Sequence, residues 1–151
     1  MYLELELIIR FKMKNLFIIT LLLLACTSQQ SIDVVEVRSV IQNQQLAWNK
    51  GLINDFMDGY WNNAEMKFIT KNGVRKGWNE TLKSYKKSYP TKEKMGELLF
   101  TDLQIDAISQ EIAHATGNWN INYPKDTIGG HFSLVFKQFR NGPKIIIDHT
   151  W

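Results

Sequence analysis

The hydrophobic period of this chain changes from 3.6 residues to 2 at about position 99, and this change limits the folds that the chain can adopt. Before that position, apolar residues recur at helical spacing over 33–51, 53–61 and 78–88. After it, apolar and polar residues alternate over 99–107, 113–121, 132–136 and 145–151. Alternating segments with short turns between them predict an antiparallel sheet. Helices followed by strands predict an α+β domain, with the helices on one face of that sheet.

Capping and turn residues mark where the predicted elements begin and end. Asp33, with Glu36 three residues later, has the spacing of a capping box at a helix N-terminus. Gly51 is placed to end this first helix, and Pro90 stops the helix that begins near position 78. The Asn-Gly pair at 72–73 follows a predicted strand at 66–70 and is typical of a tight hairpin.

The first 26 residues have the pattern of an export signal. Lys12 and Lys14 precede an apolar run at 16–24, and the small residue Ala25 stands just before Cys26. This order is typical of a secretory signal peptide. A cysteine directly after the cleavage site resembles the lipobox of bacterial lipoproteins, in which the thiol carries the lipid. The apolar run is too short for a spanning helix, which needs roughly 20 residues. We therefore predict a protein of the bacterial cell envelope, periplasmic or at the outer membrane, anchored through lipid on Cys26.

These signals divide the chain into a leader and one domain. Residues 1–26 form the predicted leader, of which 1–12 is interpreted as a spurious or loose extension because Glu4 and Glu6 are unusual there. Residues 27–32 are interpreted as a polar tether. Residues 33–151 are long enough to bury the core of a single domain.

Charge and cysteine content exclude several classes of function. The formal net charge of +3 is too small to indicate a nucleic-acid partner. Cys26 is the only cysteine, so once it is lipidated no thiol remains for a disulfide, a metal site or a nucleophile. The histidines lack any recognised metal-ligand spacing. We therefore predict neither a metal nor a cofactor.

The order of short motifs from 34 to 151 resembles SnoaL-like domains of the nuclear transport factor 2-like superfamily. The residues that carry this resemblance are 47–51, 56–61, 73, 77–78, 89–90, 95–96, 129–134 and 147–150. The resemblance implies a cone in which a strongly curved antiparallel sheet wraps around three helices, with a pocket at the wide end. It also implies a homodimer formed through the outer face of the sheet, and a branch of small secreted or lipid-anchored proteins.

Asp148 and His149, in the last predicted strand, are the first candidates for catalysis. Successive strand residues point to opposite faces, so one of the two faces the pocket and the other the outside. Alternation groups Asp148 with Ile146 and does not decide which side faces inward. If 131–139 and 145–151 form a hairpin, His131 lies close to the chain end. A buried aspartate or histidine can act as general acid or base, so Asp148, His149 and His131 are the predicted catalytic residues.

Aromatic residues supply the candidates for ligand binding. Aromatic side chains combine a large apolar surface with a polar tip, which suits a small-molecule pocket and equally an ordinary core. The predicted ligand contacts are the aromatic residues near the ends of the predicted helices and the tryptophan in the predicted strand 113–121: Tyr60, Trp61, Trp78, Tyr89 and Trp119.

Three functions follow from these features. The first is a lipid-anchored binding protein whose pocket takes an unidentified small, partly apolar ligand. The second is an acid–base enzyme, an isomerase, dehydratase or hydrolase, which uses Asp148 or His149 with His131 or Tyr60. The third is a non-catalytic dimerisation module whose cone is filled by side chains. An open cavity with a buried titratable pair favours the enzyme, and an open cavity without one favours binding.

Overall fold

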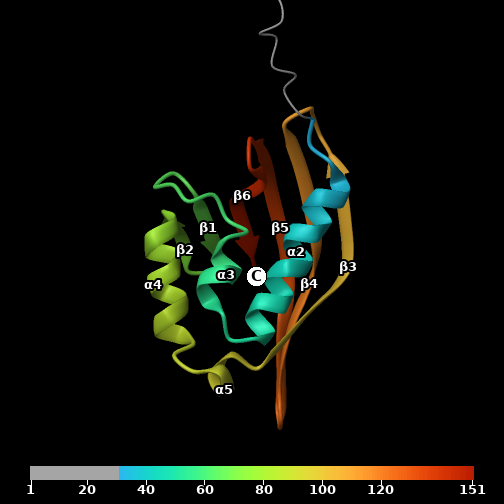
Figure 1. Cartoon of the computed structure of the whole chain (residues 1–151). Coiled ribbons are helices and arrows are strands. Elements are labelled where there is room, and N and C mark those ends of the chain that lie inside the picture. The colour runs from blue at the N-terminus through green and yellow to red at the C-terminus, as the bar shows by residue number, and fades with distance from the viewer. Residues whose placement is uncertain (1–30) are drawn as a thin grey trace, which may run out of the picture.

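The structure of the protein is a computed structural model that describes residues 31–151, so Cys26 and the predicted leader lie outside the described residues. Figure 1 shows the arrangement of its helices and strands. In chain order these are α2 (Val34–Asn49), α3 (Ile53–Met57), β1 (Lys67–Thr70), β2 (Gly73–Lys76), α4 (Trp78–Ser88), α5 (Lys92–Met95), β3 (Glu97–Ala107), β4 (Ile112–Tyr123), β5 (Asp126–Phe139) and β6 (Gly142–Thr150).

The strands form one six-stranded sheet in the order β2-β1-β6-β5-β4-β3. All neighbours are antiparallel except β1 and β6, which run parallel. The last strand therefore lies inside the sheet, where Asp148 pairs with Phe68 on β1 and with Leu134 on β5. This pairing places Asp148 in the middle of the sheet and not at an edge.

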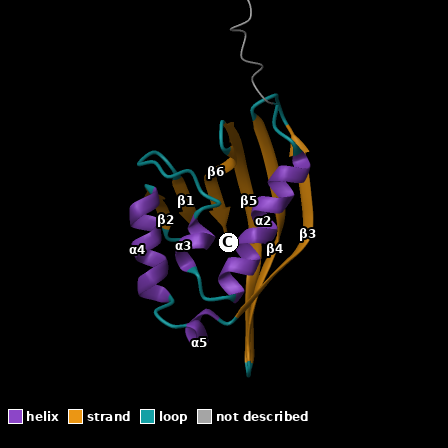
Figure 2. Ribbon diagram, viewed as in Figure 1, coloured by secondary structure: helices purple, strands orange, loops and turns teal. Residues whose placement is uncertain are grey.

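The helices lie on one face of the sheet, as the α+β prediction requires (Figure 2). Helix α2 crosses this inner face and buries Val37, Ile41 and Trp48 against it. The sheet contributes Phe136 and Ile145, which are completely buried. Burial of such apolar side chains is the main favourable term in folding. Among the helices of residues 31–151, none is both long and apolar enough to cross a membrane.

The sheet bends at a β-bulge in β3. Thr101 pairs with Asn118 and Gln104 with Thr116, so two residues of β3 lie opposite the single residue Gly117. Asp102 in this bulge has a φ of 53°, and its carboxylate accepts a hydrogen bond of 2.6 Å from the Asn118 amide. A bulge increases local twist and bends the strand that carries it. The bend helps to curve the sheet around the helices.

A second bulge in β6 corrects the alternation predicted for the last strand. Val135 pairs with Ile147, whereas Phe136 pairs with Ile145, so Ile146 has no partner on β5. The extra residue brings Ile145 and Asp148 to the same inner face although they are three residues apart. Grouping Asp148 with Ile146 was therefore wrong.

The helices also differ from the predicted boundaries. The second helix ends at Met57, because Tyr60 leaves it to form a bridge with Ile145 of β6, whose carbonyl accepts the Trp61 N–H. The one-turn helix α5 was not predicted. Ile32 is buried and its N–H donates to the Gln110 carbonyl, so packing begins within the segment interpreted as a tether.

Candidate functional site

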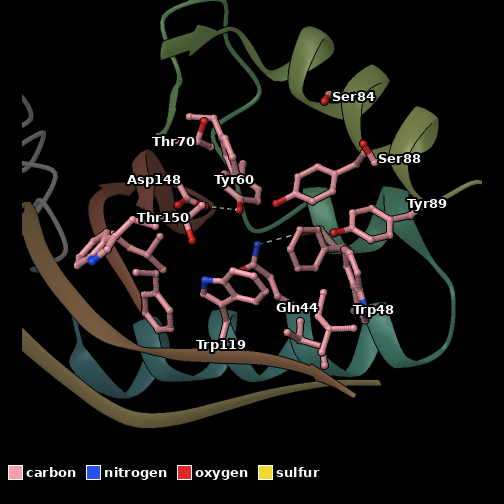
Figure 3. Close-up of a pocket in the computed structure, with 18 of the residues that line it drawn as sticks. Gln44, Trp48, Tyr60, Thr70, Ser84, Ser88, Tyr89, Trp119, Asp148 and Thr150 are labelled. Carbon is pink, nitrogen blue, oxygen red and sulfur yellow. Dashed lines mark hydrogen bonds between the residues drawn. The ribbon is translucent and has the colours of Figure 1, made fainter. Parts of the chain in front are cut away.

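A cavity of about 520 Å³ lies between the helices and the inner face of the sheet. Figure 3 shows side chains from α2, α4 and the strands that point into it. Its wall is largely aromatic and includes Trp48, Phe56, Tyr60, Phe68, Tyr85, Tyr89, Phe100, Trp119 and Phe132. Lys71 and Asn72 in the β1–β2 turn also line it and are exposed, so the cavity reaches the protein surface at this turn.

Asp148 and Tyr60 form a hydrogen-bonded pair in the cavity wall. The Tyr60 hydroxyl donates to Oδ2 of Asp148 across 2.7 Å, and both residues are buried, with exposures of 4% and 6% (Figure 3). The backbone fixes this arrangement, because the Ile145 N–H donates to the Gly59 carbonyl at 2.9 Å. The end of α3 is thereby held against β6, and the two side chains meet.

Burial changes the acidity of Asp148. It raises the pKa of this carboxyl group from the ordinary value of 3.8 to about 7, and the hydrogen bond from Tyr60 opposes the rise only in part. Desolvation disfavours the charged form of an acid, whereas a donor directed at the carboxylate favours it. The other oxygen, Oδ1, is buried without a hydrogen-bond partner in the described part of the chain. Asp148 can therefore bind and release a proton near neutral pH.

The neighbouring tyrosines remain protonated. Burial raises the pKa of both Tyr60 and Tyr85 well above the usual value, and the negative charge of Asp148 raises each of them further. Burial also raises the pKa of Tyr89. These hydroxyl groups consequently act as hydrogen-bond donors and acceptors at neutral pH, and not as phenolates.

Gln44 and Trp119 add two further polar groups to the cavity wall. Gln44 is buried, and its side-chain amide donates to the Phe56 carbonyl at 3.1 Å. The indole N–H of Trp119 is buried and has no hydrogen-bond partner among residues 31–151. Sequence reasoning missed Gln44, although a polar residue that shares the apolar helix face of Ile41 and Trp48 was a signal for it. Tyr85, which also lines the cavity, was not among the predicted ligand contacts.

The structure separates the predicted catalytic histidines from Asp148. His149 is exposed on the outer face, where its ring lies 4.8 Å from that of Trp151. His131 is also exposed, and its Nδ1 lies 2.6 Å from the Asn118 side-chain oxygen. Of the two partners predicted for Asp148, His131 and Tyr60, the structure brings Tyr60 into contact with it. Within residues 31–151, no three His, Cys, Asp or Glu side chains are placed to hold a metal ion together.

The five predicted ligand contacts also divide into two groups. Tyr60, Tyr89 and Trp119 line the cavity. Trp61 and Trp78 do not: Trp61 stacks on Phe139 with ring centroids 5.7 Å apart, and the Trp78 indole N–H donates to the Met57 carbonyl at 2.9 Å. Both tryptophans pack against the core from outside the cavity. Trp61 was misplaced because helix α3 ends at Met57, earlier than predicted.

Comparison with solved structures identifies the family. A protein of unknown function from Shewanella oneidensis MR-1, described as NTF-2 like, is 36% identical over 78% of this chain and 97% of its own, with a TM-score of 0.75. This chain belongs to the nuclear transport factor 2-like superfamily. No protein-family description and no curated protein matches it. The SnoaL-like branch within the superfamily stays a prediction.

More distant structures share the fold of this nuclear transport factor 2-like chain. A Nostoc punctiforme domain of unknown function with a cystatin-like fold is 18% identical, covering 78% of this chain and 75% of its own, with a TM-score of 0.66. A nuclear transport factor 2-like protein from Salmonella enterica serovar Typhimurium is also 18% identical, covering 75% and 85%, with a TM-score of 0.61. At this identity the likeness concerns the fold alone.

Proposed function

We propose that this nuclear transport factor 2-like protein binds a small, partly apolar molecule in the cavity, with Asp148 and Tyr60 as its principal polar contacts. The observation that carries the proposal is the buried Tyr60–Asp148 hydrogen bond in the wall of an otherwise aromatic cavity. Small-molecule sites are typically concave and mostly apolar, with a few polar groups that orient the ligand. The volume of about 520 Å³ lies within the usual range for such sites.

The energetics of Asp148 support the same proposal. A buried polar group costs free energy unless it forms hydrogen bonds, and among residues 31–151 Asp148 has one side-chain partner, Tyr60. Such a residue contributes less to folding than an apolar residue of similar size would. A ligand with a hydrogen-bond donor would compensate the unpartnered Oδ1. The filled cone of a purely structural module receives no support, because the described side chains leave the cavity open.

A fluorescence titration tests the binding proposal. The neutral dye N-phenylnaphthylamine becomes fluorescent in apolar surroundings and serves as the probe. Trp119→Ala removes a wall residue of the cavity and is expected to weaken dye binding about tenfold, the scale of loss seen when a buried aromatic contact is removed. Trp61→Ala is the matched control, because Trp61 lies outside the cavity. Equal affinities of the two variants would contradict the proposal.

An acid–base enzyme is the second candidate. The predicted sign of an enzyme, an open cavity with a buried titratable pair, is present in Asp148 and Tyr60, but Tyr60 stays protonated, so of this pair Asp148 alone titrates near neutral pH. A general base works best when its pKa lies near the working pH, and that of Asp148 is about 7. As an isomerase or dehydratase base, Asp148 would take a proton from the bound substrate; as a hydrolase base, it would take one from the attacking water. In each case the Tyr60 hydroxyl would stay hydrogen-bonded to Asp148. The product would be that of an isomerase, dehydratase or hydrolase.

Hydrogen exchange tests this second candidate. A molecule that co-purifies with the protein, identified by native mass spectrometry, would be incubated with it in heavy water. For an isomerase or dehydratase, the proposal predicts that deuterium enters a carbon position of this molecule with the wild-type protein and not with Asp148→Asn; for a hydrolase, it predicts that cleavage of the molecule is lost in Asp148→Asn. Deuterium incorporation at the same rate with both proteins would contradict a role for Asp148 as the base.

We also propose that the protein is held at a membrane of the bacterial envelope by lipid on Cys26, and that it forms a homodimer through the outer face of the sheet. The leader pattern supports the first proposal, and the family resemblance supports the second. The helices leave this outer face uncovered, and His131 and His149 are exposed on it. Sedimentation of the domain, from residue 27 onward, at about twice the monomer mass would support the dimer.

A further inference from the structure

We infer that the cavity selects an amphipathic anion, whose acidic group binds Arg75 and Lys71 at the mouth while its apolar part lies against the aromatic wall. This inference rests on the proposed binding function and adds the chemical class of the ligand. Arg75, Lys71 and Asp148 are the charged residues that line the cavity within the described part of the chain. Two of these three are cations, and both belong to the β1–β2 hairpin.

The register of the sheet places Arg75 in line with the buried carboxyl group. Arg75 pairs with Phe68, and Phe68 pairs with Asp148, so the three residues form one row across β2, β1 and β6. Neighbouring strands lie ~4.8 Å apart, which puts the backbones of Arg75 and Asp148 about 10 Å apart. An elongated ligand that spans this row would meet a cation at one end and the Tyr60–Asp148 pair at the other.

The two cations are free of ion pairs in the structure. Within residues 31–151 the salt bridges join Lys83 to Glu80 and Lys137 to Glu111, so neither Lys71 nor Arg75 takes part in one. The Arg75 guanidinium lies over the Phe68 ring, 5.6 Å from its centroid. This cation–π contact holds the group at the cavity wall and leaves its N–H donors available for an oxyanion.

Uncharged donors accompany the cations. Thr70 and Asn72 on the hairpin and Ser84 and Ser88 on α4 also line the cavity. In Figure 3, Thr70, Ser84 and Ser88 lie on the side of the cavity away from Trp119. Hydroxyl and amide groups donate to carboxylate, sulfonate or phosphate oxygens, and hydrogen bonds to charged acceptors are about twice as strong as neutral ones. The polar side of the cavity therefore matches an acidic head group.

Two dyes with the same apolar body test the inference. Anilinonaphthalene sulfonate carries a sulfonate group, whereas N-phenylnaphthylamine lacks it. The double variant Lys71→Gln, Arg75→Gln is expected to bind the sulfonate dye about tenfold more weakly than wild type and the neutral dye less than twofold more weakly. Lys76→Gln is the control, because Lys76 is exposed on the same strand and does not line the cavity; it should leave both affinities unchanged.

The outcomes separate this inference from the binding proposal beneath it. If the double variant binds the neutral dye with nearly wild-type affinity and the sulfonate dye about tenfold more weakly, the anion inference and the binding proposal are both supported. If its affinity for both dyes is unchanged, or falls equally for both, the anion inference is overturned while the proposal that the cavity binds small molecules stands. If wild-type protein binds neither dye, the binding proposal fails and the inference fails with it. Wild-type affinity for the sulfonate dye should also fall with rising salt, because salt screens exposed charges.

Discussion

The Tyr60 hydroxyl lies 2.7 Å from Oδ2 of Asp148, although the two residues are 88 positions apart in the chain. This hydrogen bond joins the segment after α3 to strand β6, and both residues line the cavity. Within residues 31–151 the Tyr60 hydroxyl is the hydrogen-bond partner of this carboxyl group, whose other oxygen is buried without one. The acidity of Asp148 and the recognition of a ligand therefore depend on the same contact.

Asp148 is expected to make the fold less stable as pH rises toward neutrality. The pKa of Asp148 is about 7 in the folded protein, against 3.8 ordinarily. Between these values the folded state retains a proton that the unfolded chain has released, so the free energy of unfolding falls as pH rises. From pH 5 to pH 8 the loss due to Asp148 is on the order of 3 kcal/mol. Denaturant unfolding across this range measures it.

Asp148→Asn supplies the control for this pH dependence, because asparagine is similar in shape and does not titrate. The free energy of unfolding of the wild type is expected to fall relative to that of the variant between pH 5 and pH 7. Above pH 7 the two free energies should change in parallel. Parallel curves over the whole range would show that Asp148 has an ordinary pKa, and would contradict the account of its burial.

Tyr60→Phe is expected to raise the pKa of Asp148 above about 7. The Tyr60 hydrogen bond lowers this pKa by stabilising the carboxylate, and phenylalanine removes the donor while keeping the ring. The variant also leaves the carboxyl group without its partner, which costs roughly 1–3 kcal/mol of folding free energy. Carbon NMR of the Asp148 carboxyl group measures the pKa directly. An unchanged or lower pKa would show that the hydrogen bond does not form in solution.

Much of the fold could be predicted from the sequence, because it depends on local periodicity. The change of period indicated the α+β class, and segments 131–139 and 145–151 were considered as a hairpin that would bring His131 close to the chain end. The structure confirms that this hairpin brings His131 next to the chain end, where the backbones of His131 and Trp151 exchange hydrogen bonds of 2.9 and 3.1 Å. These features need only the pattern of neighbouring residues.

The site could be predicted only in part, because it depends on two non-local features. The bulge at Ile146 lies within a run of three isoleucines, so no change of residue type marks where alternation fails. The end of α3 at Met57 depends on Tyr60 joining β6, a strand far along the chain. Both features are needed for Tyr60 to meet Asp148, so the sequence offered Tyr60 as one of two partners for Asp148 and could not decide between it and His131.

Trp78→Ala is expected to reduce stability and leave dye binding unchanged in the folded protein. Trp78 packs on the core and donates to the Met57 carbonyl, and it lies outside the cavity. Truncation of a packed tryptophan costs about 3 kcal/mol. Denaturant unfolding gives the stability, and titration with N-phenylnaphthylamine gives the affinity. Weaker dye binding with normal stability would place Trp78 in the binding site instead.

Cys26→Ser is expected to release the protein from membranes. If Cys26 carries the lipid, serine removes the thiol to which it is attached, and no other cysteine can replace it. Fractionation of cells that produce the full chain should then move the protein from the membrane pellet to the soluble fraction. Continued membrane association of the Cys26→Ser protein would refute lipidation at this residue.

The most direct test of the central claim is an NMR titration of the domain with N-phenylnaphthylamine. The Trp119 indole N–H is buried at the cavity wall and has no partner in the described part of the chain, so its signal reports on the cavity interior. The account predicts that the dye shifts the signals of Trp119, Tyr60 and Asp148 and leaves those of the exposed His131 and His149 in place. Shifts confined to the outer-face histidines, or no shifts at all, would contradict the claim that this cavity binds a small molecule.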